Sequence, residues 1–114
     1  MLKYSVVLVP FPFDDLSSNK VRPAVCLTEP IGQHHHVVLA FISSREPRKP
    51  LTTDILISVN EADFRNTGLH ISSVLRLHRM MTVTTNIIQR KLGQLSKPKQ
   101  EAIQKQLKIL FDLE

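Results

Sequence analysis

The strongest constraint on the fold is the apolar run HVVLAFIS, which extends from His36 to Ser43. Polar residues do not alternate with apolar ones inside it, so a strand built from this run carries apolar side chains on both faces. Such a strand is stable only when other parts of the protein cover each face. We therefore expect the strand over residues 36–43 to be central in a sheet.

Further strands are expected on both sides of this run. Their segments are rich in β-branched residues or alternate between apolar and polar residues, and proline, glycine and charged residues separate them. Asn60 is a candidate cap for a short helical turn that ends near Gly68, and Gly93 indicates a bulge or a close backbone approach. The expected strands cover residues 4–9, 24–28, 54–59, 73–80 and 89–95.

The hydrophobic period changes after Ser96, which is a candidate helix cap, and Pro98 suits a first helical turn. Apolar residues then recur at helical spacing, at Ile103, Leu107, Leu110 and Phe111. We expect a mainly β fold in which a C-terminal amphipathic helix packs against a mostly antiparallel sheet. The 114 residues suffice for a single domain, residues 1–114.

The charge of the chain favours an anionic partner. Fifteen Lys and Arg residues against ten Asp and Glu residues give a formal net charge of +5. Residues 64–100 contain no acid and seven basic residues. A solvated face of mixed sign does not have this composition, although a small basic protein without a nucleic-acid partner remains the alternative.

Cysteine content and the N-terminus indicate the compartment. Cys26 is the single cysteine, so no intrachain disulfide can form, and its apolar strand predicts a buried, inert thiol. The N-terminal apolar run is broken at Pro10 and Pro12 and is too short for a signal peptide or a membrane span. We expect a cytoplasmic protein with no membrane association. The histidines at 34–36 are expected in a solvated turn rather than in a metal site.

Most signatures of cofactor and metal enzymes are missing. The sequence has no phosphate-binding Gly-rich loop, no cysteine pair at metal spacing, no His-Glu-x-x-His and no nucleophile elbow. We therefore expect neither a cofactor nor a metal. The remaining candidates are Arg22 where a loop enters a strand, Ser43, Ser44 and Arg45 at the end of the central strand, and Arg76 with His78 on another strand.

Arg22 stands directly before Pro23, which biases its backbone to extended conformations and lowers the cost of aiming its side chain. One reaction that could use such an arginine is the cleavage of RNA without a metal. In that reaction the ribose 2′-hydroxyl attacks the adjacent phosphorus, and hydrogen-bond donors must stabilise the crowded phosphorane that results. A guanidinium binds phosphate oxygens in two-point geometry and stays charged at any working pH. It cannot act as a general base, because its proton is too hard to remove.

Each candidate also has an ordinary structural explanation. Arg22 could be a surface residue in an ion pair worth well under ~1 kcal/mol. Its acidic neighbours would be Asp14, Asp15 or Glu29. Ser43 could be a strand-end hydroxyl bonded to the backbone, and His78 could be an exposed strand residue rather than a proton carrier. The residues alone leave these alternatives open.

Six segments follow one another in a specific order and spacing from Val6 to the final helix. They are VVLVPFPFDDLSSNKVRPAVCL, FISSR, DILI, TGL, SVLRLH and RKLGQLS. In this order they resemble the PemK and MazF family of toxins from bacterial toxin-antitoxin systems. The resemblance implies a small SH3-like β-barrel with a C-terminal helix, paired as a symmetric homodimer.

The resemblance also implies an activity and a set of site residues. Members of the family are metal-independent endoribonucleases that cut single-stranded RNA at short sequences, inhibit growth and are held inactive by a cognate antitoxin protein. The implied catalytic residues are Arg22, Ser43, Arg76 and His78. The residues that we expect to bind RNA are Lys20, Ser44, Arg45, Arg48, Lys49 and Arg79.

The chain departs from the family pattern at three places. Tyr4 and Ser5 stand where many relatives have a Gly-Asp pair, which changes the entry to the barrel. Ser43 replaces a more frequent threonine and keeps the hydroxyl. His78 replaces an acid, which leaves the identity of the proton acceptor open, although a neutral imidazole can accept a proton at pH 7.

Two other functions stay open. A gyrase-binding toxin similar to the CcdB family would need no RNA site, and its determinants would lie toward the final helix. A non-catalytic RNA-binding relative would bind RNA without turnover. The five Phe and one Tyr lie mostly in apolar strands, which disfavours broad base stacking. Cleavage of a defined RNA in EDTA, with gyrase supercoiling untouched, separates these functions.

Overall fold

The computed structural model describes residues 1–10 and 20–114. Within these ranges the strands are β1 (Ser5–Pro10), β2 (Val21–Cys26), β3 (His36–Ser43), β4 (Asp54–Ile57), β5 (Ser73–Thr84) and β6 (Arg90–Gln94). The helices are the short 3-10 helices η1 (Phe64–Thr67) and η2 (Thr85–Ile87) and the α-helix α1 (Lys97–Leu110). The predicted mainly β architecture with a C-terminal helix is confirmed.

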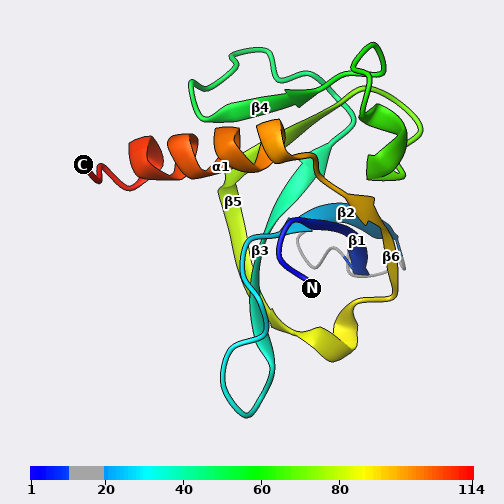
Figure 1. The fold of residues 1–114 in the computed structure, drawn as a ribbon, viewed down its shortest axis with the longest axis vertical. Coiled ribbons are helices and arrows are strands. Elements are labelled where there is room, and N and C mark those ends of the chain that lie inside the picture. The colour runs from blue at the N-terminus through cyan, green and yellow to red at the C-terminus, as the bar shows by residue number, and fades with distance from the viewer. Residues whose placement is uncertain (11–19) are drawn as a thin grey trace.

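The strands form one curled sheet in the order β4-β5-β3-β2-β1-β6, and each described pairing is antiparallel. Figure 1 shows α1 lying across the sheet next to β4, while β1, β2 and β6 form the opposite side of the curl. The strand β3 has β5 on one edge and β2 on the other. The prediction that residues 36–43 form a central strand is therefore confirmed.

The two faces of β3 contribute to two separate hydrophobic clusters. Leu39 and Phe41 pack with apolar residues of β1 and β2 on one face, and Ala40 and Ile42 pack on the face that contains Ile103 of α1. All five side chains are at most 4% exposed. The unbroken apolar run is explained by this arrangement, because consecutive residues of a strand point into different cores.

The helical spacing of apolar residues explains how α1 packs against the sheet. Ile103 is fully buried, and Leu107 and Leu110 pack against the same cluster. Ser96 is the N-cap residue and Pro98 lies in the first turn, although no side-chain capping hydrogen bond forms. Phe111 differs from the prediction: it lies beyond the last helical residue and is 56% exposed.

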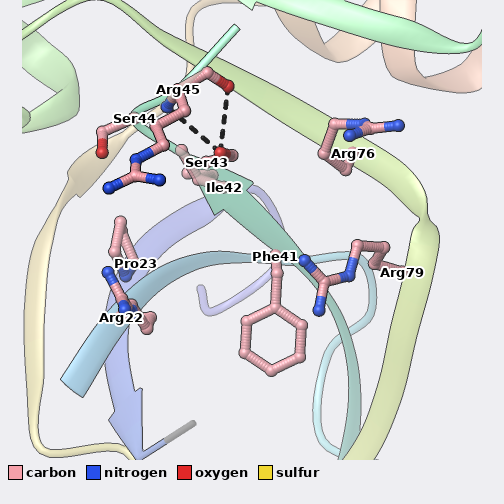
Figure 2. A pocket seen from close by; sticks show the side chains of 9 residues that line it. All are labelled: Arg22, Pro23, Phe41, Ile42, Ser43, Ser44, Arg45, Arg76 and Arg79. Atoms are coloured by element: carbon pink, nitrogen blue, oxygen red, sulfur yellow. Dashed lines mark hydrogen bonds between the residues drawn. The ribbon is translucent and has the colours of Figure 1, made fainter. Parts of the chain in front are cut away.

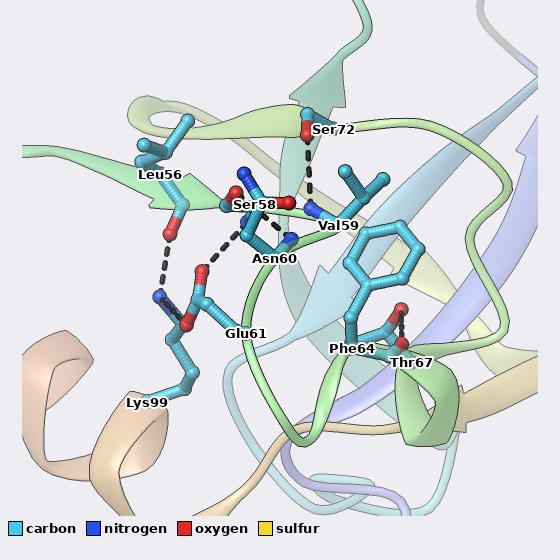
Figure 3. Close-up of polar contacts among 9 residues, drawn as sticks. All are labelled: Leu56, Ser58, Val59, Asn60, Glu61, Phe64, Thr67, Ser72 and Lys99. Carbon is cyan, nitrogen blue, oxygen red and sulfur yellow. Dashed lines mark hydrogen bonds and ion pairs between the residues drawn. The ribbon is translucent and has the colours of Figure 1, made fainter.

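Lys99 connects α1 to β4 and to the segment that follows it (Figure 3). Its ammonium group is 2.8 Å from Glu61 Oε2 and donates to the carbonyl of Leu56. Glu61 in turn accepts a hydrogen bond from the backbone of Ser58 through Oε1. These contacts hold the short edge strand β4 against the helix.

Three element bounds differ most from the predictions. The strand β2 begins at Val21 rather than at residue 24, so Arg22 and Pro23 lie inside it, and they pair with β1. The strand β5 continues to Thr84, because it pairs with β3 along the whole length of that strand. The short helical turn begins at Phe64 rather than at Asn60, whose N–H instead binds the Ser58 hydroxyl.

Tyr4 adopts the left-handed conformation, with φ of 68°, which favours glycine. Here the tyrosine ring is buried in the cluster that faces α1, and its hydroxyl accepts a hydrogen bond from Gln104 at 3.1 Å. The neighbouring Ser5 is fully buried and donates to Gln94 Oε1. Burial of the ring and its bond to α1 offset the backbone strain.

Cys26 is fully buried, as predicted. Its thiol should make the free energy of unfolding depend on pH. Burial, with a smaller effect of Glu29, raises the pKa of its thiol from 9.0 to about 11. The folded state therefore keeps a proton that the unfolded chain loses above pH 9. We expect the free energy of unfolding to fall by about 3 kcal/mol between about pH 9 and pH 11 from this group. Urea titrations should detect this fall, and Cys26→Ala should remove it.

Candidate active site

A pocket lies between β2, β3 and β5, where β3 ends (Figure 2). Its volume is about 450 Å³. The described lining residues are Arg22, Pro23, Phe41, Ile42, Ser43, Ser44, Arg45, Arg76 and Arg79. This lining contains four arginines and two serine hydroxyls, and none of its residues is an acid or a histidine. The described part of the lining is therefore strongly positive.

Pro23 explains why β2 and β3 separate at the pocket. The described pairs between these strands end at Ala24 with Phe41. The next residue of β2 is Pro23, which has no N–H to donate to a ladder. Beyond this point Figure 2 shows Arg22 and Arg45 on one side and Arg76 and Arg79 on the other, with Ser43 between them. The Arg-Pro step thus both ends the ladder and places a guanidinium at the opening.

The Ser43 hydroxyl is bonded to the backbone of Arg45. Its Oγ donates to the Arg45 carbonyl at 3.0 Å and accepts from the Arg45 N–H at 3.1 Å. Ser43 is therefore a strand-end hydroxyl bonded to the backbone, which is the structural alternative considered from the sequence. The same bonds turn the chain sharply after β3, which brings Ser44 and Arg45 to the rim of the pocket (Figure 2).

A shift of register in β5 decides which of its side chains reach the pocket. Ala40 of β3 pairs with Met80, but the next residue, Phe41, pairs with Arg76, so residues 77–79 have no partner of their own in β3. Regular alternation would put residues 76 and 78 on one face. With the extra residues, Arg79 joins Arg76 in the lining and His78 does not line the pocket. His78 is instead an exposed residue of the strand.

Arg76 has an acidic partner that sequence analysis missed. Its Nε donates to Asp54 Oδ1 at 2.7 Å, and the two residues are directly opposite in β5 and β4. The carboxylate is held in place, because Oδ2 accepts the Leu51 N–H at 2.8 Å. Asp54 opens the segment DILI, but only the strand register shows that it faces Arg76.

The other predicted RNA-binding residues lie outside the described lining. Lys20 is an exposed residue just before β2, and Arg48 and Lys49 are exposed in the segment between β3 and β4. Three acids, Asp14, Asp15 and Glu29, were considered from the sequence as ion-pair partners of Arg22. Asp14 and Asp15 lie outside the described residues. The carboxylate of Glu29 accepts the Leu2 N–H at 2.7 Å, which lowers the pKa of Glu29.

His34 and His35 are exposed in the turn between β2 and β3, as predicted, whereas His36, which is also exposed, is the first residue of β3. Across residues 1–10 and 20–114, no group of three or more His, Cys, Asp or Glu side chains is arranged to hold a metal ion. No helix of the described chain is both long and apolar enough to cross a membrane.

The fold is that of known toxin structures. "Mycobacterium tuberculosis toxin MazF-mt6" superposes with a TM-score of 0.72 at 22% identity, over 96% of this chain and 98% of that one. An endoribonuclease in complex with its cognate antitoxin from a mycobacterial species gives a TM-score of 0.70 at 16% identity, over 100% and 97%. The MazE-MazF structure from Deinococcus radiodurans also gives 0.70, at 12% identity, over 98% and 95%. The predicted barrel class is therefore confirmed.

The family is shown by the sequence itself. The family model described as "PemK-like, MazF-like toxin of type II toxin-antitoxin system" matches residues 3–111, and the chain belongs to this family. No curated protein matches the chain in sequence at a significant level.

Proposed function

We propose that this toxin is a sequence-selective endoribonuclease that cleaves single-stranded RNA without a metal and thereby inhibits growth. The single observation that supports this most is that four arginines and Ser43 line one pocket of about 450 Å³. Guanidinium groups match phosphate oxygens in charge and in two-point geometry. A phosphodiester of single-stranded RNA is a ligand of this chemistry.

The reaction would begin with attack of a ribose 2′-oxygen on the adjacent phosphorus. The bond from phosphorus to the 2′-oxygen forms and the bond to the 5′-oxygen breaks, which leaves a 2′,3′-cyclic phosphate and a 5′-hydroxyl. The 2′-hydroxyl proton is released and the departing 5′-oxygen takes up a proton. Arg22 and Arg76 would stabilise the extra negative charge of the phosphorane from two strands.

The Ser43 hydroxyl could donate to the same phosphorane without disturbing the chain turn. Rotation about its C–O bond moves its hydrogen from the Arg45 carbonyl toward a phosphate oxygen. The oxygen would still accept the Arg45 N–H, since a hydroxyl has two acceptor lone pairs. Ser44, Arg45 and Arg79 would bind the flanking phosphates or bases.

We assign no proton transfer to His78, because it is outside the described pocket lining. Among the described lining residues, none is a histidine or an acid. The proposal therefore attributes the rate enhancement to electrostatic stabilisation by the arginines, with water as the proton acceptor. Such stabilisation is commonly the largest contribution in enzymes.

Partners and context belong to the same proposal. We infer that the chain acts in the cytoplasm as a homodimer of single-domain protomers. A cognate antitoxin protein would inhibit it, as the complex of a structurally similar mycobacterial endoribonuclease suggests. Acidic side chains of such an antitoxin would compete with RNA for the arginines of the pocket.

The test is incubation of the purified protein with a defined RNA in EDTA, followed by mapping of the RNA ends. We expect cleavage at a short sequence, and a substrate with a 2′-deoxyribose at the cleaved position should stay intact. Binding without turnover would identify a non-catalytic RNA-binding protein. Intact RNA together with inhibited gyrase supercoiling would identify a gyrase-binding toxin.

The exposed cations outside the pocket should affect RNA affinity but not turnover. Each phosphate contact contributes a slope of about 0.7 to the dependence of log affinity on log salt for single strands. We expect Arg48→Ala with Lys49→Ala to reduce this slope by up to about 1.4, measured by fluorescence anisotropy on an uncleavable 2′-deoxy substrate. The charge-matched control is Lys105→Ala with Lys108→Ala on α1, and an equal reduction there would contradict the prediction.

A further inference from the structure

The contact between Asp54 and Arg76 is unusual, because it places a carboxylate next to a pocket that needs positive charge. Asp54 does not line the pocket, and its side chain is only 7% exposed. A single carboxylate beside four arginines weakens their attraction for a phosphate, so electrostatics alone would disfavour it. Its retention in the site calls for a geometric explanation.

The atoms that make the contact supply this explanation. Asp54 Oδ1 accepts the Nε–H of Arg76, so the terminal nitrogens of the guanidinium, which carry the remaining N–H donors, are left to other partners. Asp54 Oδ2 is bound to the Leu51 N–H, and the Asp54 N–H binds the Leu51 carbonyl at 3.0 Å. The carboxylate is thus fixed to the backbone before it contacts Arg76.

Arg76 needs such an anchor because the pocket is crowded with like charges. Arg79 approaches from the same strand as a result of the register shift, and Arg22 and Arg45 line the same space. Mutual repulsion would turn a flexible arginine side chain toward solvent. The side chain of Arg76 is only 18% exposed, which agrees with a guanidinium held in place.

We propose that Asp54 is a positioning residue, which aims the terminal nitrogens of Arg76 at the phosphate in the pocket. This inference rests on the proposed nuclease function. Asp54 contacts no reacting atom and acts only through Arg76. Displacement of a catalytic group by about 1 Å can reduce a rate by about a hundredfold, so loss of the anchor should be visible in turnover.

Asp54→Asn is the first test, because the asparagine oxygen can still accept the Leu51 N–H. We expect kcat to fall on the order of tenfold to a hundredfold. KM should stay unchanged or decrease, since the pocket becomes more positive. Glu101→Gln removes the same charge from an exposed position of α1 and should change both constants by less than about twofold. Unchanged kcat in Asp54→Asn, with normal thermal unfolding, would overturn the proposal.

The same Asp54→Asn change in an Arg76→Lys protein distinguishes a positioning role of Asp54 from general damage to the fold. Lysine has no Nε–H of this geometry, so in an Arg76→Lys protein the Asp54→Asn change should lower kcat by less than about twofold. An equal loss in both backgrounds would show that Asp54 acts independently of Arg76, and it would overturn the proposal.

A measurement without RNA distinguishes this proposal from the nuclease proposal. In NMR spectra of the unmodified protein, the Arg76 Nε–H should exchange slowly with water, and Asp54→Asn should abolish that protection. Slow exchange in a protein that cannot cleave RNA would support the anchor and contradict the nuclease function. Rapid exchange in a protein that cleaves RNA would overturn the anchor and leave the nuclease function standing.

Discussion

Replacement of Arg22 by alanine is expected to reduce RNA cleavage by at least about a hundredfold, with the oligomeric state and thermal stability unchanged. Arg22 is in β2 at the point where this strand parts from β3, and it lines the pocket across from Arg76 and Arg79 (Figure 2). It is partly exposed, so its removal leaves no large cavity in the core. The loss should therefore appear in catalysis and not in folding.

Arg22→Lys is the informative companion variant. Lysine keeps the charge but not the planar fork, so we expect it to retain RNA affinity while cleavage stays at least about tenfold below that of the unmodified protein. Cleavage and growth inhibition are the measurements. Unchanged cleavage by Arg22→Ala would exclude this pocket as the active site.

Gly93→Ala is expected to destabilise the fold by about 3 kcal/mol or more, which would lower Tm by about 10 °C. A Cβ atom at this position would lie 2.1 Å from the backbone oxygen of Asn66 and 2.6 Å from the carbonyl carbon of Thr67. Both neighbours are backbone atoms of η1, so no side-chain rotation can relieve the clash. Thermal unfolding and urea titration measure the effect.

Gly32→Ala is the matched control. Gly32 has φ of 72°, and no atom lies within 4 Å of the Cβ position. Alanine there meets only the conformational cost of a positive φ, and we expect the free energy of unfolding to fall by about 1 kcal/mol. Comparable losses at the two glycines would show that close packing of β6 on η1 is not what requires Gly93.

The sequence was sufficient for the elements whose periodicity is strong. The run from His36 to Ser43 predicted a central strand with two covered faces, and the spacing of Ile103 and Leu107 predicted α1. Gly93 was correctly interpreted, because it lies both at a shift of the β1–β6 register and at a close approach to η1. These features depend on local chemistry, which a single sequence contains.

The site was predicted less completely, because it depends on register. Arg22, Ser43 and Arg76 do line one pocket. The extra residues in β5 are not apparent in the sequence, so His78 was predicted on the same face as Arg76, whereas Arg79, which was predicted to bind RNA, is the one that lines the pocket. The contact of Asp54 with Arg76 joins residues of separate strands, and nothing in either segment alone indicates their pairing.

End mapping of a defined single-stranded RNA, incubated in EDTA with the unmodified protein and in parallel with Arg22→Ala, tests the central claim most directly. The proposed pocket predicts one short cleavage sequence, a 2′,3′-cyclic phosphate beside a 5′-hydroxyl, and no product from Arg22→Ala. Intact RNA with the unmodified protein, or identical products from both proteins, would contradict it.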